Sequence, residues 1–264
     1  MTPGEPVSHF VRVEVRDRLA IVSMARPPVN ALGSVLALQL AEAFEGIAAN
    51  ERLRAVVVAS DLNHFFMAGA DLVELQEGKE SARALVSSVG RALDALASLE
   101  AVTYAAINGH ALGGGLELAI CCDIRYAAEG QYSLGLPEIT LGLLPGGGGT
   151  QRLPRLIGAA RALEWMISGR RVSPSEALEA GLVHALFPAE TLKDQVVRAA
   201  TMIADGPTIA VRSIKHLVSH APARVDRSGL ERERELFLAL FDTRDAAEGM
   251  SAFLRRVAPR FTGT

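Results

Sequence analysis

Residues 102–127 read VTYAAINGHALGGGLELAICCDIRYA, and this stretch decides the fold class. Its first six residues, 102–107, are β-branched, aromatic or apolar, as in a strand covered on both faces. Three glycines at 113–115 follow, and the apolar stretch from Gly114 to Cys121 predicts a short helix. Residues 124–127 predict a second strand. A strand, a helix and another strand in this order predict a crossover between parallel strands and therefore an α/β fold.

The segments before this stretch continue the same alternation. β-branched and polar residues alternate around a turn-prone segment near the start of the chain, which predicts a hairpin. Helical spacing of apolar residues begins at Ser34, an expected N-cap. The expected elements are strands at 11–15, 19–24 and 55–60, and helices from Ser34 to Ile47 and at 82–99.

The last expected strand covers residues 183–187, and the rest of the chain has helical spacing. This change predicts two parts, an α/β core at 1–195 and a helical region at 196–264. The alternating charges of residues 231–235 (ERERE) fit either a partner surface or a solvated helix face, and we favour the solvated face.

Composition narrows the class of protein. Hydrophobic residues make up 49% and charged residues 22% of the chain, as in soluble globular proteins. The formal charge of −3 offers no bulk attraction to nucleic acid or acidic membranes, and no apolar run is long enough to span a membrane. Cys121 and Cys122 are adjacent, which disfavours a disulfide and favours a reducing compartment. We therefore expect a cytoplasmic protein that binds neither nucleic acid nor membrane.

Two segments could supply backbone donors to a carbonyl oxygen. Gly114 begins the expected helix, where its N–H is unpaired and no Cβ keeps a ligand away. The segment from Met67 to Asp71 also lies where a helix could begin, with Asp71 as N-cap and Glu74 closing a capping box. If the Ala70 and Gly114 amides faced each other, they would form an oxyanion hole. A tight turn at Gly114 and an ordinary capped helix at Asp71 are the alternatives.

Glu117 and Glu138 are the candidate acid and base. Glu117 falls in the first turn of the expected helix, where the helix dipole favours a carboxylate without any catalytic role. Glu138 follows Pro137 in a stretch that resembles a loop, where a solvated side chain is the alternative. Together they would suit acid–base chemistry on an activated carbonyl compound.

The sequence lacks the motifs typical of metal binding, covalent catalysis and dinucleotide binding. The six histidines include no HExxH, so we expect no metal site. No serine lies in GxSxG, and neither cysteine has an evident base, which disfavours covalent catalysis. The glycine clusters match neither GxxxxGK[ST] nor GxGxxG, so dinucleotide-dependent oxidoreduction is also disfavoured.

The chain resembles the enoyl-CoA hydratase/isomerase (crotonase) family over nearly its whole length. Four segments in the family's order carry the resemblance: Arg26 to Leu32 (RPPVNAL), Phe66 to Leu72 (FMAGADL), Asn108 to Leu118 (NGHALGGGLEL), and Pro137 to Leu153, which contains PGGGGTQRL. The resemblance implies a crotonase-like (ClpP/crotonase) spiral of ββα units that forms two sheets. It also implies a C-terminal helical oligomerisation region and assembly into a homotrimer or a homohexamer made of two trimers.

The resemblance also implies the site and its reaction. Ala70 and Gly114 would hold the thioester carbonyl, and Gly146 would help to position the water. Glu117 would act as base toward that water and Glu138 as acid toward the α-carbon, so that a trans-2-enoyl-CoA becomes a 3-hydroxyacyl-CoA. The implied contacts with coenzyme A are those of Arg26, Val29, Ala31, Ala68, Asp71 and Leu72, with Phe253 and Arg256 near the adenine of an adjacent subunit.

By this interpretation coenzyme A is part of the substrate and no separate cofactor is expected. The reaction would serve the degradation of fatty acids or related acyl-CoA thioesters. Family isomerases that move a 3-enoyl double bond often keep one acidic group, so the presence of Glu117 and Glu138 favours hydration. The alternatives are an enoyl-CoA isomerase, a specialised crotonase-family lyase and an RNA-binding protein without turnover.

Overall fold

The computed structural model describes residues 9–221 and 227–264, and these form two sheets with helices around them. The larger sheet has the strand order β1-β2-β3-β5-β7-β10 and the smaller sheet the order β4-β6-β8-β9. The strands are β1 Val11–Arg16, β2 Leu19–Met24, β3 Ala55–Ser60, β4 His64–Met67, β5 Val102–Ile107, β6 Gly109–Leu112, β7 Ile124–Ala128, β8 Leu134–Gly135, β9 Arg171–Val172 and β10 Ala185–Phe187.

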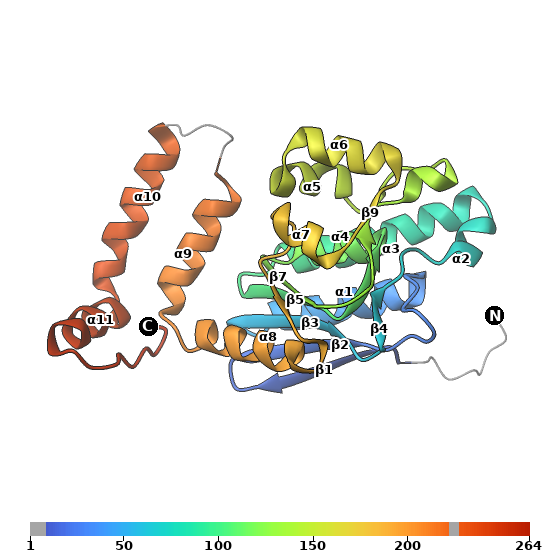
Figure 1. Ribbon diagram of the computed structural model, residues 1–264. Helices are drawn as coiled ribbons and strands as arrows, with labels where there is room; N and C mark the ends of the chain where they lie inside the picture. The colour runs from blue at the N-terminus through green and yellow to red at the C-terminus, as the bar shows by residue number, and fades with distance from the viewer. Residues whose placement is uncertain (1–8, 222–226) are drawn as a thin grey trace.

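The helices follow the strands in a repeated ββα order (Figure 1). In three successive repeats the first strand (β3, β5, β7) joins the large sheet and the second (β4, β6, β8) joins the small one. This arrangement confirms the predicted spiral of ββα units. The α-helices are α1 Ser34–Ala48, α2 Leu72–Gln76, α3 Lys79–Ala97, α4 Gly114–Cys121, α5 Gly149–Ile157, α6 Ala159–Ser168, α7 Pro174–Glu179, α8 Ala189–Ala204, α9 Thr208–Ser219, α10 Arg227–Ala239 and α11 Arg244–Arg255, and two short 3₁₀ helices are η1 Glu138–Leu141 and η2 Leu240–Asp242.

The two faces of the large sheet are covered by different helices. Successive residues of a strand point to opposite faces, so one strand contributes side chains to both sides. Val56 and Val58 pack with the α1 residues Leu36 and Leu40 in one apolar cluster. Their neighbours in β3 belong to a second cluster, which includes Leu192, Val196, Ala200 and Ala204 of α8. Both clusters draw on β3, so the strand AVVVAS is buried on both faces as predicted.

Helix α8 crosses the expected boundary between the two parts of the chain. It runs through residues 195 and 196, and its apolar face packs on the large sheet. The division into a core at 1–195 and a helical region at 196–264 stays a prediction. Figure 1 shows α9, α10 and α11 extending from one side of the body that contains the sheets.

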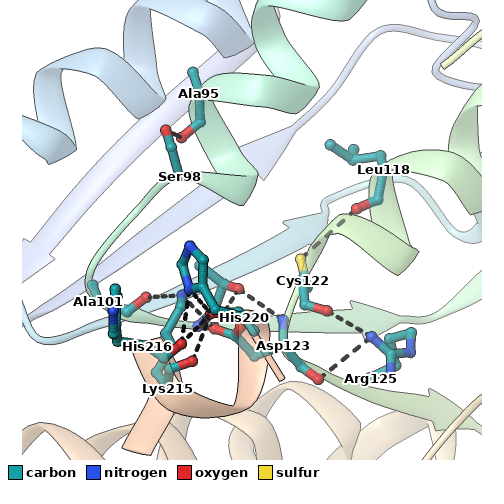
Figure 2. A network of polar contacts seen from close by, with 12 residues as sticks. Ala95, Ser98, Ala101, Leu118, Cys122, Asp123, Arg125, Lys215, His216 and His220 are labelled. Atoms are coloured by element: carbon teal, nitrogen blue, oxygen red, sulfur yellow. Dashed lines mark hydrogen bonds and ion pairs between the residues drawn. The ribbon is translucent and has the colours of Figure 1, made fainter. Parts of the chain in front are cut away.

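A half-buried lysine, Lys215, connects α9 to the large sheet (Figure 2). Lys215 Nζ donates to the carbonyl oxygen of Ala101 at 2.8 Å and pairs with Asp123 Oδ2 at 2.7 Å. The same Asp123 oxygen accepts from the amide of Thr103 in β5 at 2.8 Å. Since Asp123 immediately precedes β7, one carboxylate joins α9 to two strands of the sheet.

The start of α1 differs from the sequence prediction. Gly33 is the N-cap, and Ser34 is the first helical residue. The carboxylate of Glu74 accepts from the Ser34 amide at 2.9 Å and from its hydroxyl group. Glu74 therefore caps α1 from α2 instead of closing a capping box with Asp71. Local spacing could not predict this contact between residues 40 positions apart.

Cys121 and Cys122 are both free and buried. Burial raises the pKa of Cys121 to about 12 and raises the pKa of Cys122 further, so both stay thiols at neutral pH. In the described part of the chain, no helix is both long enough and apolar enough to span a membrane.

Candidate active site

The loop after β2 is held in place by the side chain of Asn30. Its Oδ1 accepts from the Arg26 amide at 2.6 Å, and its Nδ2 donates to Ser60 Oγ at 2.8 Å and to the Phe66 carbonyl oxygen at 3.0 Å. Asn30 is fully buried and has a φ of +52°, which asparagine adopts more readily than most residues. Because Ser60 ends β3 and Phe66 lies in β4, one side chain joins the loop to both sheets.

Arg26 and Asp71, both expected to bind coenzyme A, pair with each other. Arg26 Nη2 lies 2.7 Å from Asp71 Oδ2, and Nη1 donates to the carbonyl oxygen of Ala31. Asp71 is the N-cap of α2 as predicted, and its side chain accepts from the amides of Val73 and Glu74. The hydrogen bond from Arg26 is the main reason that the pKa of Asp71 is lowered. The pair fixes the loop against the segment that carries Ala70.

Leu32 sets the direction of the Ala70 amide. The two residues form a parallel bridge in which the Leu32 amide donates to the Gly69 carbonyl at 2.7 Å. The Asp71 amide donates back to the Leu32 carbonyl at 3.1 Å. In a parallel bridge the residue between two bonded neighbours points its own N–H the other way. The Ala70 N–H is therefore aimed away from the Leu32 backbone.

Helix α4 brings the Gly114 amide to the same place. A Cβ built on Gly69 would lie 3.2 Å from the Leu112 carbonyl oxygen, and one on Gly113 would lie 3.6 Å from the Gly69 Cα. A Cβ on Gly114 would lie 2.9 Å from Leu32 Cδ2, so Leu32 contacts both segments. Gly114 is the first residue of α4, and its N–H therefore has no partner in the preceding turn. The structure brings the two predicted donor segments side by side.

Glu117 lies in the first turn of α4 and is only 3% exposed. Its Oε1 accepts from the amides of Gly147 and Gly149, each at 2.8 Å. Burial raises the pKa of Glu117, and the two amides and the charge of Arg152 partly oppose that rise. The hydrogen bonds favour the ionised form, which is the form that a general base needs.

Glu138 has a different environment at the start of η1. Its Oε2 is buried and has no hydrogen-bond partner among the residues that the structure describes. Burial raises the pKa of Glu138 to about 7, and the charge of Glu117 adds to this rise while the amide of Glu138 itself opposes it. Half-buried in a 3₁₀ helix, Glu138 is not the solvated loop residue that was the alternative.

The two carboxyl groups are thus neighbours with unequal environments. Glu138 Oε1 lies 3.1 Å from the position that a Cβ on Gly113 would take, next to the start of α4. The Glu117 carboxylate with its two amide donors, the Glu138 carboxyl group with its pKa raised to about 7, and the segments that carry the Ala70 and Gly114 amides therefore lie together. Such a set can move protons to and from a carbonyl compound while the amides stabilise negative charge on its oxygen.

The other residues expected to contact coenzyme A surround these elements. The Val29 carbonyl accepts from the Ala68 amide at 3.0 Å, and Ala31 accepts from Arg26. Leu72, the first residue of α2, is 48% exposed. Gly146 is exposed in the loop before α5. Their roles toward coenzyme A or water stay predictions.

Phe253 and Arg256 lie elsewhere in the chain. Phe253 is in α11 and is 82% exposed, and Arg256 is the C-cap of the same helix. In Figure 1, α11 and α2 lie on opposite sides of the molecule. These two residues therefore do not join the carboxyl pair of their own chain, and their contact with an adjacent subunit stays a prediction.

A hollow of about 650 Å³ lies between α9, α10 and the end of α3, away from the carboxyl pair. Its lining includes several cationic side chains, but these already have acidic partners. Arg212 pairs with Glu100 at 3.1 Å, and Lys215 pairs with Asp123 at 2.7 Å. None of the predicted site residues lines this hollow.

Sequence reasoning missed the residues that hold the predicted groups in position. Asn30 fixes the loop, Leu32 contacts both donor segments, and Gly147 and Gly149 hold Glu117. Arg152 anchors the glycine loop through the Gly147 carbonyl at 2.8 Å. The sequence offered two signals, the polar Asn30 in an otherwise apolar loop and the run of glycines at 146–149. Neither signal identifies the residue that the group contacts.

Comparison with known proteins agrees with this geometry. The family model described as enoyl-CoA hydratase/isomerase matches residues 14–264. The chain is 36% identical over 252 residues to the 2,3-dehydroadipyl-CoA hydratase of Escherichia coli (strain K12), covering 95% of this chain and 98% of that protein. It is 40% identical over 251 residues to the mitochondrial enoyl-CoA hydratase domain-containing protein 2 of Bos taurus, covering 93% of this chain and 84% of that protein.

Solved structures are similar over the same extent. The crystal structure of an enoyl-CoA hydratase from Bacillus anthracis superposes with a TM-score of 0.91 at 37% identity, covering 97% of this chain and all of that chain. A second structure, from Geobacillus kaustophilus, gives a TM-score of 0.90 at 34% identity, covering 97% and 98%. The architecture is therefore that of the crotonase fold.

Proposed function

The chain belongs to the enoyl-CoA hydratase/isomerase family, and from this premise we propose that it adds water to trans-2-enoyl-CoA thioesters and forms 3-hydroxyacyl-CoA. The observation that carries the proposal is the pair of unequal carboxyl groups, Glu117 and Glu138, beside the amides of Ala70 and Gly114. An isomerase needs one group that takes and returns a proton. Hydration needs a base for water and an acid for carbon, which is the division that these environments favour.

In the proposed reaction the thioester oxygen accepts from the Ala70 and Gly114 amides. This polarises the carbonyl and makes the β-carbon electrophilic. Glu117 takes a proton from water as the water oxygen bonds to the β-carbon, and the π electrons move toward the thioester oxygen. Glu138 then gives its proton to the α-carbon, and the enolate collapses to the 3-hydroxyacyl thioester. Because the carboxyl groups interact, they titrate as a pair.

The proposal extends to the substrate and the assembly. Arg26, Val29, Ala31, Ala68, Asp71 and Leu72 are proposed to contact coenzyme A, and Gly146 to help position the water. Phe253 and Arg256 are proposed to reach the adenine in an adjacent subunit of a homotrimer or homohexamer. The enzyme would act in the degradation of fatty acids or related acyl thioesters without a separate cofactor. A cytoplasmic location stays a prediction.

The test compares two substrates with the purified protein. Loss of the enoyl-thioester absorbance of crotonyl-CoA, with 3-hydroxybutyryl-CoA as product, is the expected result. Turnover of a 3-enoyl-CoA without hydration of crotonyl-CoA would identify an isomerase instead. If neither thioester nor longer or branched ones react and the protein binds RNA with strong salt dependence, the hydratase proposal is wrong.

A further inference from the structure

Arg152 lies in α5 and contacts the loop that holds Glu117. Its Nη1 donates to the carbonyl oxygen of Gly147 at 2.8 Å, and its Nη2 lies 3.7 Å from Asp94 Oδ1 in α3. The Arg152 side chain is 27% exposed, whereas Asp94 is 82% exposed. An ion pair with so exposed a partner contributes little, so the hydrogen bond to the loop is the stronger of the two contacts.

Gly147 connects Arg152 to the candidate base. Its carbonyl accepts from Arg152, while its amide donates to Glu117 Oε1 at 2.8 Å. The loop lies so close to Arg152 that a Cβ on Gly148 would be 2.2 Å from Nη1, and Gly148 has a φ of +97°. The guanidinium and the carboxylate therefore hold neighbouring peptide groups of one tight turn.

We propose that Arg152 is a positioning residue that holds the glycine loop so that the amides of Gly147 and Gly149 grip the Glu117 carboxylate in its ionised form. The assignment of Glu117 as base rests on the function proposed above, but the effect on its ionisation does not. Without the Arg152 hydrogen bond the turn loosens and the two donors lose their aim at Oε1.

The charge of Arg152 acts in the same direction. Burial raises the pKa of Glu117, and the Arg152 charge and both glycine amides oppose that rise. The other titratable groups near this pair are Glu138 of η1, Cys121 of α4 and Asp94 of α3. Cys121 stays neutral at working pH, so Glu138 and Asp94 are the remaining acidic groups near this pair.

The activity test uses Arg152→Gln, Arg152→Lys and a matched control, Arg155→Gln, which changes an exposed arginine of the same helix. We expect the acid limb of kcat/KM for crotonyl-CoA to move up by about one pH unit in Arg152→Gln, with about a tenfold loss below the limb. Arg152→Lys keeps a charge and a donor and should recover part of the shift. An unchanged limb in folded Arg152→Gln overturns the proposal.

A direct titration keeps this test separate from that of the proposed function. Glutamate labelled with ¹³C at the carboxyl carbon is followed by NMR against pH, and Glu117→Gln identifies the Glu117 signal. We expect a higher pKa of Glu117 in Arg152→Gln than in the wild type, even if crotonyl-CoA is not hydrated. If Arg152→Gln does not fold, Arg152→Lys carries the test with a smaller upward shift, and an unshifted Glu117 signal overturns the proposal.

Discussion

Replacing Gly147 with alanine should weaken the grip on Glu117 without removing a catalytic group. The new Cβ would lie 2.6 Å from Glu117 Oε2 and 2.6 Å from Leu93 Cδ1. Ordinary contacts are ~3.4 Å or longer, so the carboxylate or the loop must shift by ~0.8 Å. The 2.8 Å bond from the Gly147 amide to Oε1 would then lengthen beyond the normal range. Losing a hydrogen bond to a charged group costs ~1.5–3 kcal/mol, or about 10- to 150-fold in kcat/KM.

The assay is kcat/KM for crotonyl-CoA between pH 5 and pH 9, with circular dichroism as a check on folding. The loss should be largest on the acid side, because removing an amide donor raises the pKa of Glu117. Gly46→Ala is the matched control, since a Cβ at that exposed position of α1 meets nothing within 4 Å. A folded Gly147→Ala enzyme with wild-type kcat/KM at every pH would refute the assigned role of the loop.

Three further predictions concern the backbone donor Gly114, the proposed acid Glu138, and Asn30, which holds the loop after β2. Gly114→Pro, which removes the N–H at a first helical position that proline tolerates, should lower kcat by about 10²–10³-fold while coenzyme A still binds in calorimetry. Gly114→Ala keeps the N–H and adds the same Cβ, which would lie 2.9 Å from Leu32 Cδ2, so an equal loss in both variants would assign the effect to that Cβ and contradict the oxyanion role. With the pKa of Glu138 raised to about 7, its protonated fraction falls from about one half at pH 7 to about 9% at pH 8, so kcat/KM should fall about fivefold, and a flat alkaline limb would contradict its role as acid. Asn30→Ala leaves buried partners unsatisfied and should lower the free energy of unfolding in urea by about 2–3 kcal/mol, whereas a change below about 0.5 kcal/mol would show that the loop does not depend on it.

The large sheet could be predicted because each of its buried strands carries its own signal. The run AVVVAS at β3 and the strand, glycine and helix order from β5 to α4 depend on local composition and periodicity. The small sheet could not be predicted in the same way. Strands β8 and β9 have two residues each, so their existence depends on pairing with distant segments and not on local pattern.

In the candidate site, too, contacts between residues close in sequence could be predicted, and contacts between distant residues could not. Gly114 and Glu117 belong to one helical turn, so their relation follows from sequence spacing. The grip of Gly147 on Glu117 spans 30 residues, and the contact of Glu74 with Ser34 spans 40. Contacts between residues so far apart depend on how distant segments pack, which local spacing does not show. The capping box predicted for Glu74 was wrong for this reason, because Glu74 accepts from Ser34 instead.

The central claim is that two carboxyl groups share the addition of water, and the hydration rate of crotonyl-CoA tests it most directly. The wild type is compared with Glu117→Gln and Glu138→Gln, each checked for folding and for coenzyme A binding. We predict that each variant binds coenzyme A normally and loses at least ~10²-fold in kcat. Wild-type kcat in either folded variant would contradict the claim.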